Sequence, residues 1–121
     1  MKVYDRIKLA MAATANSNAD DPIGITLISK DKVLLISTCN TKEDTEIERA
    51  IKQAKYQSKN LSGATAYITT LCTPGQWHKL QELGVTQLIY QYDEFEHIGL
   101  FSTEVQALCL KEYIPVKVKL T

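Results

Sequence analysis

GATAYITTLCTPGQWHKLQELGVTQLIYQY, residues 63–92, is the stretch that decides the fold of this chain. Residues 64–70 and 87–92 are rich in β-branched and aromatic side chains, whereas the pattern over 76–83 is helical. A strand, a helix and a second strand in this order form a parallel βαβ unit, because parallel strands need a long crossover connection. We therefore predict a sheet that carries helices on its faces.

The flanking segments extend this unit in both directions. Periodicity and turn residues predict helices over 4–15, 41–60 and 103–112, and strands over 23–29, 33–38 and 116–120. In the first helix Ile7, Ala10 and Met11 share one face, and Arg6 and Lys8 lie outside it. The chain of 121 residues is long enough for one domain with its own core, and we expect a single domain over 1–121.

Charge and cysteine content exclude some classes of function. Fourteen basic and fourteen acidic residues give a net charge of zero, and the basic ones are scattered, so no broad nucleic-acid surface is expected. Three cysteines without metal-type spacing indicate free thiols in a reducing compartment. No signal peptide or membrane-spanning segment is expected at the N-terminus, which favours a cytoplasmic location.

The unit over 63–92 resembles the corresponding part of the cytidine and deoxycytidylate deaminases. In that family a Pro-Cys-x-x-Cys turn binds zinc at the start of the helix, and an Ala-Gly-Ile or Ala-Gly-Val step leads into the next strand. Residues 83–85, Leu-Gly-Val, match that step, and the two cysteine positions fall on Thr73 and Gln76, with Pro74 between them. The resemblance implies a three-layer α-β-α fold with a mixed five-stranded sheet in the order 2-1-3-4-5.

The resemblance also gives positions for the other family residues, a zinc-binding His and a catalytic Glu two residues later. If Ala50 and Ile51 are matched to the family's Ala-Ile, these positions fall on Thr45 and Ile47. A family asparagine that hydrogen-bonds the sugar or base corresponds to Asn40. An equally good interpretation is that Asn40 only turns or caps the chain before the helix.

A second alignment places Asp44-Thr45-Glu46 over the family's His-x-Glu and keeps a carboxylate for proton transfer. The helical face favours the first alignment, because Glu46 is turned about 100° from Ile47, toward solvent or a helix edge. The spacing of Thr41 and Asp44 has the form of a capping box that opens this helix. Thr73 and Gln76 have the same form at the next helix.

Neither threonine nor glutamine replaces a zinc-binding thiolate. The sequence therefore predicts an inactive deaminase-like protein without zinc or another cofactor. We expect it to bind a pyrimidine nucleotide, or a protein as homo- or hetero-oligomer, and not a membrane. The expected ligand-binding residues are Asn40, Thr45, Thr73 and Gln76. The alternative is an active zinc hydrolase or deaminase with a displaced metal site at Cys39, Cys72 and His78.

Overall fold

The structure, a computed structural model, describes residues 3–92 of the chain. Its elements in chain order are α1 (Val3–Ala13), a short 3₁₀ turn η1 (Thr14–Asn16), β1 (Gly24–Ile28), β2 (Leu34–Cys39), α2 (Glu46–Tyr56), β3 (Thr65–Thr70), α3 (Pro74–Glu82) and β4 (Gln87–Tyr92). The predicted helix over 103–112 and the predicted strand over 116–120 lie outside the described residues.

The four described strands form one mixed sheet in the order β2-β1-β3-β4. β1 runs antiparallel to both β2 and β3, whereas β3 and β4 are parallel. The parallel βαβ unit predicted over 63–92 is thus confirmed as β3-α3-β4. The predicted order 2-1-3-4-5 is confirmed for these four strands, and the predicted fifth strand lies outside the described residues.

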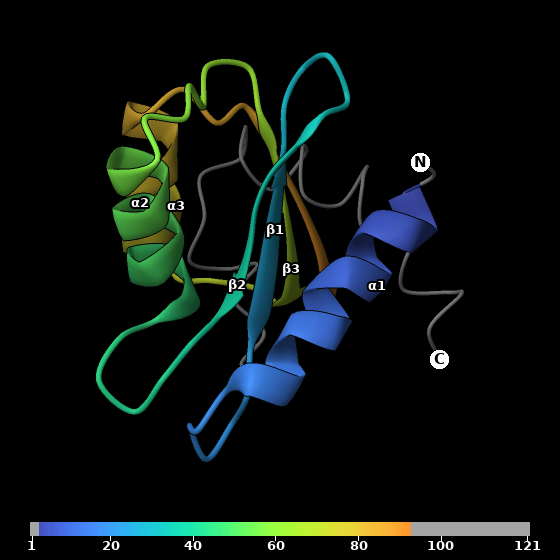
Figure 1. Ribbon diagram of the computed structural model, residues 1–121, viewed down its shortest axis with the longest axis vertical. Helices are drawn as coiled ribbons and strands as arrows, with labels where there is room; N and C mark the ends of the chain where they lie inside the picture. Colours follow the sequence, from blue (N-terminus) through green and yellow to red (C-terminus); the bar gives the residue numbers. More distant parts are fainter. Residues whose placement is uncertain (1–2, 93–121) are drawn as a thin grey trace.

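Helices cover both faces of the sheet, as predicted. α2 and α3 lie together on one face and α1 lies on the other (Figure 1). The main core fills the space between the sheet and the α2 and α3 pair. It consists of Ile25, Leu27, Ile36, Ile47, Ala50, Ala54, Leu61, Ala64, Ala66, Ile68, Leu71, Cys72, Trp77, Leu80, Val85, Leu88 and Tyr90. Burial of this apolar surface holds α2 and α3 against the sheet.

Two expectations for α1 are wrong. Arg6 was placed outside the apolar face, but it is buried, and its Nη1 donates a hydrogen bond to the Tyr67 hydroxyl at 2.6 Å. The guanidinium also lies 5.6 Å from the centre of the Tyr67 ring. A long arginine side chain can cover apolar surface with its stem and find a polar partner at its tip, which is why it tolerates this position. Met11, expected on the apolar face of this helix, is exposed.

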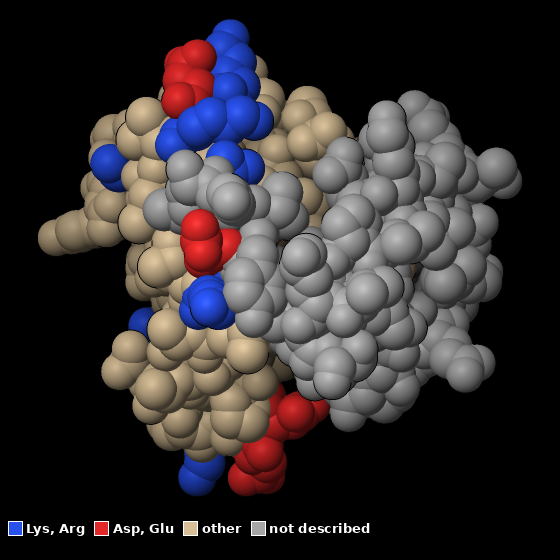
Figure 2. Space-filling model, turned by 90° about the vertical axis from the view of Figure 1, so that its right-hand side faces the viewer, with Lys and Arg blue, Asp and Glu red and all other residues tan. Residues whose placement is uncertain are grey.

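The surface gives two further observations. On the face that carries α1, basic and acidic side chains of the described residues form small separate groups rather than one continuous basic area (Figure 2). Across residues 3–92, each helix is too short or too polar to cross a membrane.

Candidate functional site

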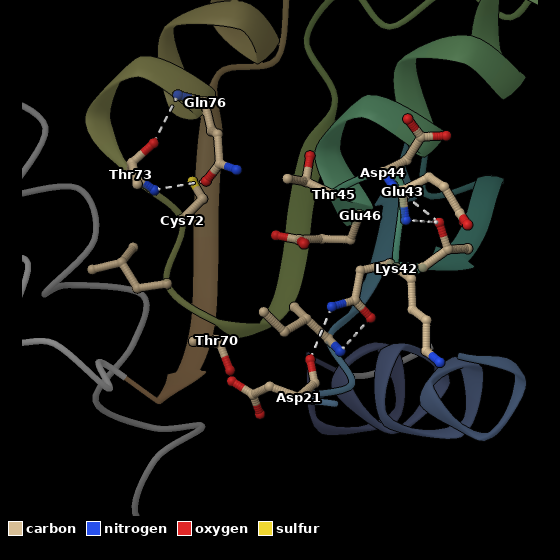
Figure 3. Close-up of a pocket in the computed structure, with 14 residues that line it drawn as sticks. Asp21, Lys42, Glu43, Asp44, Thr45, Glu46, Thr70, Cys72, Thr73 and Gln76 are labelled. Atoms are coloured by element: carbon tan, nitrogen blue, oxygen red, sulfur yellow. Dashed lines mark hydrogen bonds between the residues drawn. The ribbon is translucent and has the colours of Figure 1, made fainter. Parts of the chain in front are cut away.

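The helices α2 and α3 begin next to each other at one end of the sheet. β2 and β3 both run antiparallel to β1, so their C-terminal ends lie at this same end. A pocket of about 310 Å³ opens there (Figure 3). Its walls are the segments that follow the strands and start the helices: Asp21, Ile23, Asn40, Thr41, Lys42, Glu43, Asp44, Thr45, Glu46, Thr70, Leu71, Cys72, Thr73 and Gln76.

The start of α3 agrees with the prediction. Thr73 is the N-cap, and its Oγ1 accepts a hydrogen bond from the Gln76 backbone N–H at 3.2 Å. Gln76 returns the interaction, because its Oε1 accepts from the Thr73 N–H at 2.9 Å. Pro74 occupies the first turn, where its missing N–H costs nothing. Both predicted residues therefore line the pocket, and both have their polar groups engaged in a capping box.

The start of α2 differs from the prediction. Thr41 does accept hydrogen bonds from the N–H groups of Glu43 and Asp44, but these close a turn that precedes the helix. The helix begins at Glu46, with Thr45 as N-cap; Thr45 Oγ1 accepts from the Glu48 N–H at 3.1 Å. The sequence contains a signal for this start that we did not use, since Thr45-x-x-Glu48 has the capping-box spacing.

This later start changes the position of Glu46. It was expected to face solvent or a helix edge, but only 3% of it is exposed, and it lines the pocket. In Figure 3 its carboxyl points away from α2 into the space opposite Cys72 and Thr73. Glu46 is the first residue of the helix, so its direction is set by the chain that leads into α2 as well as by the helical repeat. Sequence reasoning thus missed a pocket residue.

Burial is also the main influence on the ionisation of Glu46. It raises the pKa of this carboxyl from an ordinary 4.5 to about 7. A hydrogen bond with its own backbone opposes the rise, and the nearby charge of Glu48 adds to it. Across residues 3–92 no other residue forms a hydrogen bond or ion pair with this carboxyl. Near neutral pH the pocket therefore contains a group that is able to give or take a proton.

Asn40 is already used by the fold. Its Oδ1 accepts from the Ile23 N–H at 2.9 Å and from the Ser17 hydroxyl at 2.8 Å, and its Nδ2 donates to the Asp21 carbonyl at 2.9 Å. The side chain ties the loop before β1 to the end of β2. One amide hydrogen is left for other contacts.

The residues at the family's three metal positions and at its catalytic Glu position do not fit zinc. Thr45 and Thr73 are helix caps, Gln76 completes a capping box, and Ile47 is fully buried in the core. Zinc in proteins is held by thiolate, imidazole or carboxylate groups, and these four positions provide none of them. Over residues 3–92, no three His, Cys, Asp or Glu side chains lie in one group that could hold a metal ion.

The alternative metal site is not formed by the residues proposed for it. Cys72 lines the pocket, whereas Cys39 is absent from its wall and lies 3.6 Å from Arg49 Nη1. His78 is exposed on α3 and pairs with Glu82 at 2.9 Å, one turn further along the helix. Three ligands on one ion must converge, and the structure does not bring these three together.

Comparison with known proteins gives a fold but no close relative. No protein-family profile and no curated protein sequence matches the chain. Among solved structures, the apo dCMP deaminase from the cyanophage S-TIM5 superposes with a TM-score of 0.71 at 16% identity, over 89% of this chain and 94% of that one. The same enzyme in complex with dCMP and dUMP gives a TM-score of 0.67 at 14% identity, over 99% and 94%.

A larger protein also contains this fold. It is a diaminohydroxyphosphoribosylaminopyrimidine deaminase/5-amino-6-(5-phosphoribosylamino)uracil reductase from Thermotoga maritima, with a TM-score of 0.59 and 15% identity over 93% of this chain. The match spans 32% of that protein. The resemblance seen in the sequence is thereby confirmed for the fold, which this chain shares with these solved deaminase structures.

Proposed function

We propose that this chain is a deaminase-fold protein that binds a small ligand without hydrolysing it. One observation carries the proposal: the side chains at the two positions of the cysteine pair, Thr73 and Gln76, are bonded to each other's backbone in a capping box. Together with Thr45, which caps α2, they hold the ends of two helices by hydrogen bonds. A bound metal would hold these helix starts in place. Here neutral groups hold them, and neutral groups do not activate water.

Binding in the pocket is supported by its size and polarity. Its volume of about 310 Å³ lies at the lower end of the range that holds small organic ligands. The wall offers the buried carboxyl of Glu46 and the hydroxyl of Thr70, and Asn40 keeps one amide hydrogen. Pyrimidine nucleosides and nucleotides are the first ligands to test, because a solved neighbour of this fold is a complex with dCMP and dUMP.

Two measurements on the purified full-length protein test this function. Metal analysis after expression in zinc-supplemented medium is expected to find far less than one zinc per chain. Incubation with cytidine, deoxycytidine and their monophosphates is expected to release no ammonia, while titration calorimetry detects binding of at least one of them. Stoichiometric zinc, or ammonia formed at a rate proportional to protein concentration, contradicts the proposal.

The second candidate is an enzyme with a displaced metal site in which Cys72 is a ligand, although Cys39 and His78, the other two residues of that alternative, do not line the pocket. Glu46 favours it, since the structure gives the pocket a buried carboxyl of the kind that transfers protons in enzymes. Cys72 is the discriminating residue because its side chain lines the pocket. In this case about one zinc per chain would be found, and Cys72→Ala would lose it.

Assembly with a second copy or with another protein belongs to the proposal as well. Size-exclusion chromatography with light scattering measures it directly. A monomer at all concentrations, without a co-purifying protein, removes assembly from the proposal and leaves ligand binding unaffected.

A further inference from the structure

The pocket wall has an unusual balance of charge for a site in a nucleotide-binding fold. Its ionisable side chains are Lys42, Asp21, Glu43, Asp44, Glu46 and Cys72. Lys42 is the one basic residue among the described wall residues, and in Figure 3 its side chain runs away from Glu46. Asp44 is paired with Lys52 at 3.1 Å, which leaves the other carboxylates to set the local potential. An anion would meet this negative field.

The helix ends offset this field only in part. The N-terminus of a helix attracts phosphate when its N–H groups are free. In α2 the Glu48 N–H is bonded to Thr45, and in α3 the Gln76 N–H is bonded to Thr73. Glu46 also places its own carboxyl at the N-terminus of α2, where a phosphate would otherwise lie.

Glu46 itself points to the kind of ligand. It is 97% buried, its carboxyl faces the cavity, and no other residue within 3–92 hydrogen-bonds to it or pairs with it. A buried carboxylate whose hydrogen bond is only with its own backbone is costly unless a further donor reaches it. An N–H donor with positive charge is the strongest partner for such a group.

We propose that this pocket selects a small unphosphorylated organic cation, with an amidine or amine group bonded to Glu46, and rejects phosphorylated ligands. The inference rests on the proposed function in that it takes the pocket as the ligand site, and it narrows the ligand to compounds without phosphate. The Thr70 hydroxyl also lines the wall and is a neutral partner for the rest of the ligand.

A series of three compounds of one shape tests the charge preference. Benzamidine, benzamide and benzoate carry positive, zero and negative charge on nearly the same frame. Calorimetry at about pH 8, where Glu46 is ionised, is expected to give benzamidine at least about tenfold tighter binding than benzamide, because charge-assisted hydrogen bonds are the stronger ones. Benzoate is expected to show no binding. Tighter binding of benzoate, or no binding of benzamidine, overturns the inference.

Two variants test whether Glu46 causes the preference for benzamidine over benzamide. Glu46→Gln keeps the size of the side chain and is expected to reduce the advantage of benzamidine over benzamide to less than about threefold. Glu82→Gln removes the same charge from the far end of α3, outside the pocket wall, and is expected to keep the full advantage. An unchanged advantage in Glu46→Gln contradicts the assignment. Thermal unfolding of both variants checks that they are folded.

Binding of benzamidine is also expected to depend on pH. The titratable and charged groups around Glu46 are Glu48 on α2, Asp21, Lys42, Glu43 and Asp44 on the loops, and Cys72 after β3. With the Glu46 pKa at about 7, affinity should fall about tenfold from pH 8 to pH 6, as the ionised fraction falls. Glu46→Gln should remove this fall. A wild-type affinity independent of pH contradicts the inference.

Cytidine, its 5′-amino-5′-deoxy analogue and its 5′-monophosphate separate this inference from the proposed function. Binding of the amino analogue and cytidine but not of the monophosphate supports both. Tightest binding of the monophosphate overturns the charge preference and leaves pyrimidine binding intact. Binding of benzamidine without binding of any member of the cytidine series overturns the pyrimidine ligand and leaves the charge preference intact.

Discussion

Glu46 makes the stability of the fold depend on pH. Its pKa is raised from 4.5 to about 7 by burial, so the folded chain holds this proton more tightly than the unfolded chain does. The stabilisation is complete below the unfolded pKa and is lost as pH rises through the folded pKa. The corresponding change in the free energy of unfolding between these limits is about 3 kcal/mol at most.

We therefore predict that Glu46→Gln is more stable than the wild type above about pH 7, by up to about 3 kcal/mol, and that this advantage vanishes near pH 4.5. Thermal and urea unfolding across this range measure it. Glu82→Gln, exposed on α3, is the matched control and is expected to follow the wild-type profile. A Glu46→Gln profile parallel to that of the wild type would mean that the carboxyl is not desolvated.

Asn40 allows a prediction that separates a structural role from ligand binding. Its Oδ1 accepts from the Ile23 N–H and the Ser17 hydroxyl, and its amide donates to Asp21. Asn40→Ala is expected to lower the free energy of unfolding by about 2–3 kcal/mol, since the part-buried Ile23 N–H loses its acceptor. Asn40→Asp keeps that acceptor and is expected to lose less. Equal stability of Asn40→Ala and the wild type, measured in urea, contradicts this role.

At the level of single residues, the sequence predicted local interactions and missed a non-local one. Thr73 and Gln76 bond to each other across three positions of the chain, so their capping box was visible in the sequence. The burial of Glu46 depends on residues after β3, more than twenty positions away, which form the opposite wall of the pocket. No short pattern around Glu46 contains that information.

At the scale of the elements, the backbone of α1 lies very close to the backbone of β1 at Gly24. A β-carbon added at Gly24 would lie 1.7 Å from the Ala10 carbonyl oxygen, so the absence of a side chain lets the helix approach the strand. We predict that Gly24→Ala pushes α1 from the sheet and costs about 1–3 kcal/mol or more, because an overpacked backbone contact has little room to relax. Urea unfolding monitored by circular dichroism measures the loss.

Gly75 in α3 provides the matched control for this substitution. The nearest atom to an added β-carbon there is Thr73 Oγ1 at 4.0 Å. Gly75→Ala is therefore expected to be neutral or to stabilise by up to about 1 kcal/mol through helix propensity. If both variants lose the same stability, steric contact with α1 is not the cause of the effect at Gly24.

Element boundaries were predicted well where turn residues mark them and poorly where two signals compete. The Pro74 start of α3 and the Gly84 turn before β4 follow from residue types with strict backbone preferences. Before α2, Thr41 and Thr45 both precede an acidic residue by three positions. Ile47, Ala50 and Ala54, on the buried stripe, are compatible with either start, so the choice was wrong by four residues.

At the scale of the whole molecule, side-chain packing and hydrogen bonds connect the helices on both faces to the sheet between them. The core connects α2 and α3 to β1 and β3, and Arg6 links α1 to β3 through Tyr67. The strand order was predicted from the resemblance, whereas the pattern alone required only a βαβ unit. Charge in the pocket was not predicted, since its acidic residues come from segments between 21 and 46 that only folding brings together.

This organisation predicts that the fold does not depend on a metal. Structural zinc commonly contributes on the order of 10 kcal/mol to folding, so its removal unfolds the domains that need it. Here the starts of α2 and α3 are held by the Thr45 and Thr73 caps, each worth about 1 kcal/mol. Excess EDTA or phenanthroline is therefore expected to change the midpoint of thermal unfolding by less than about 1 °C. Thr73→Ala, in contrast, is expected to lower that midpoint by about 4–8 °C per kcal/mol lost. A midpoint that falls on chelation and recovers with added zinc would show that a metal replaces the caps in holding the two helices.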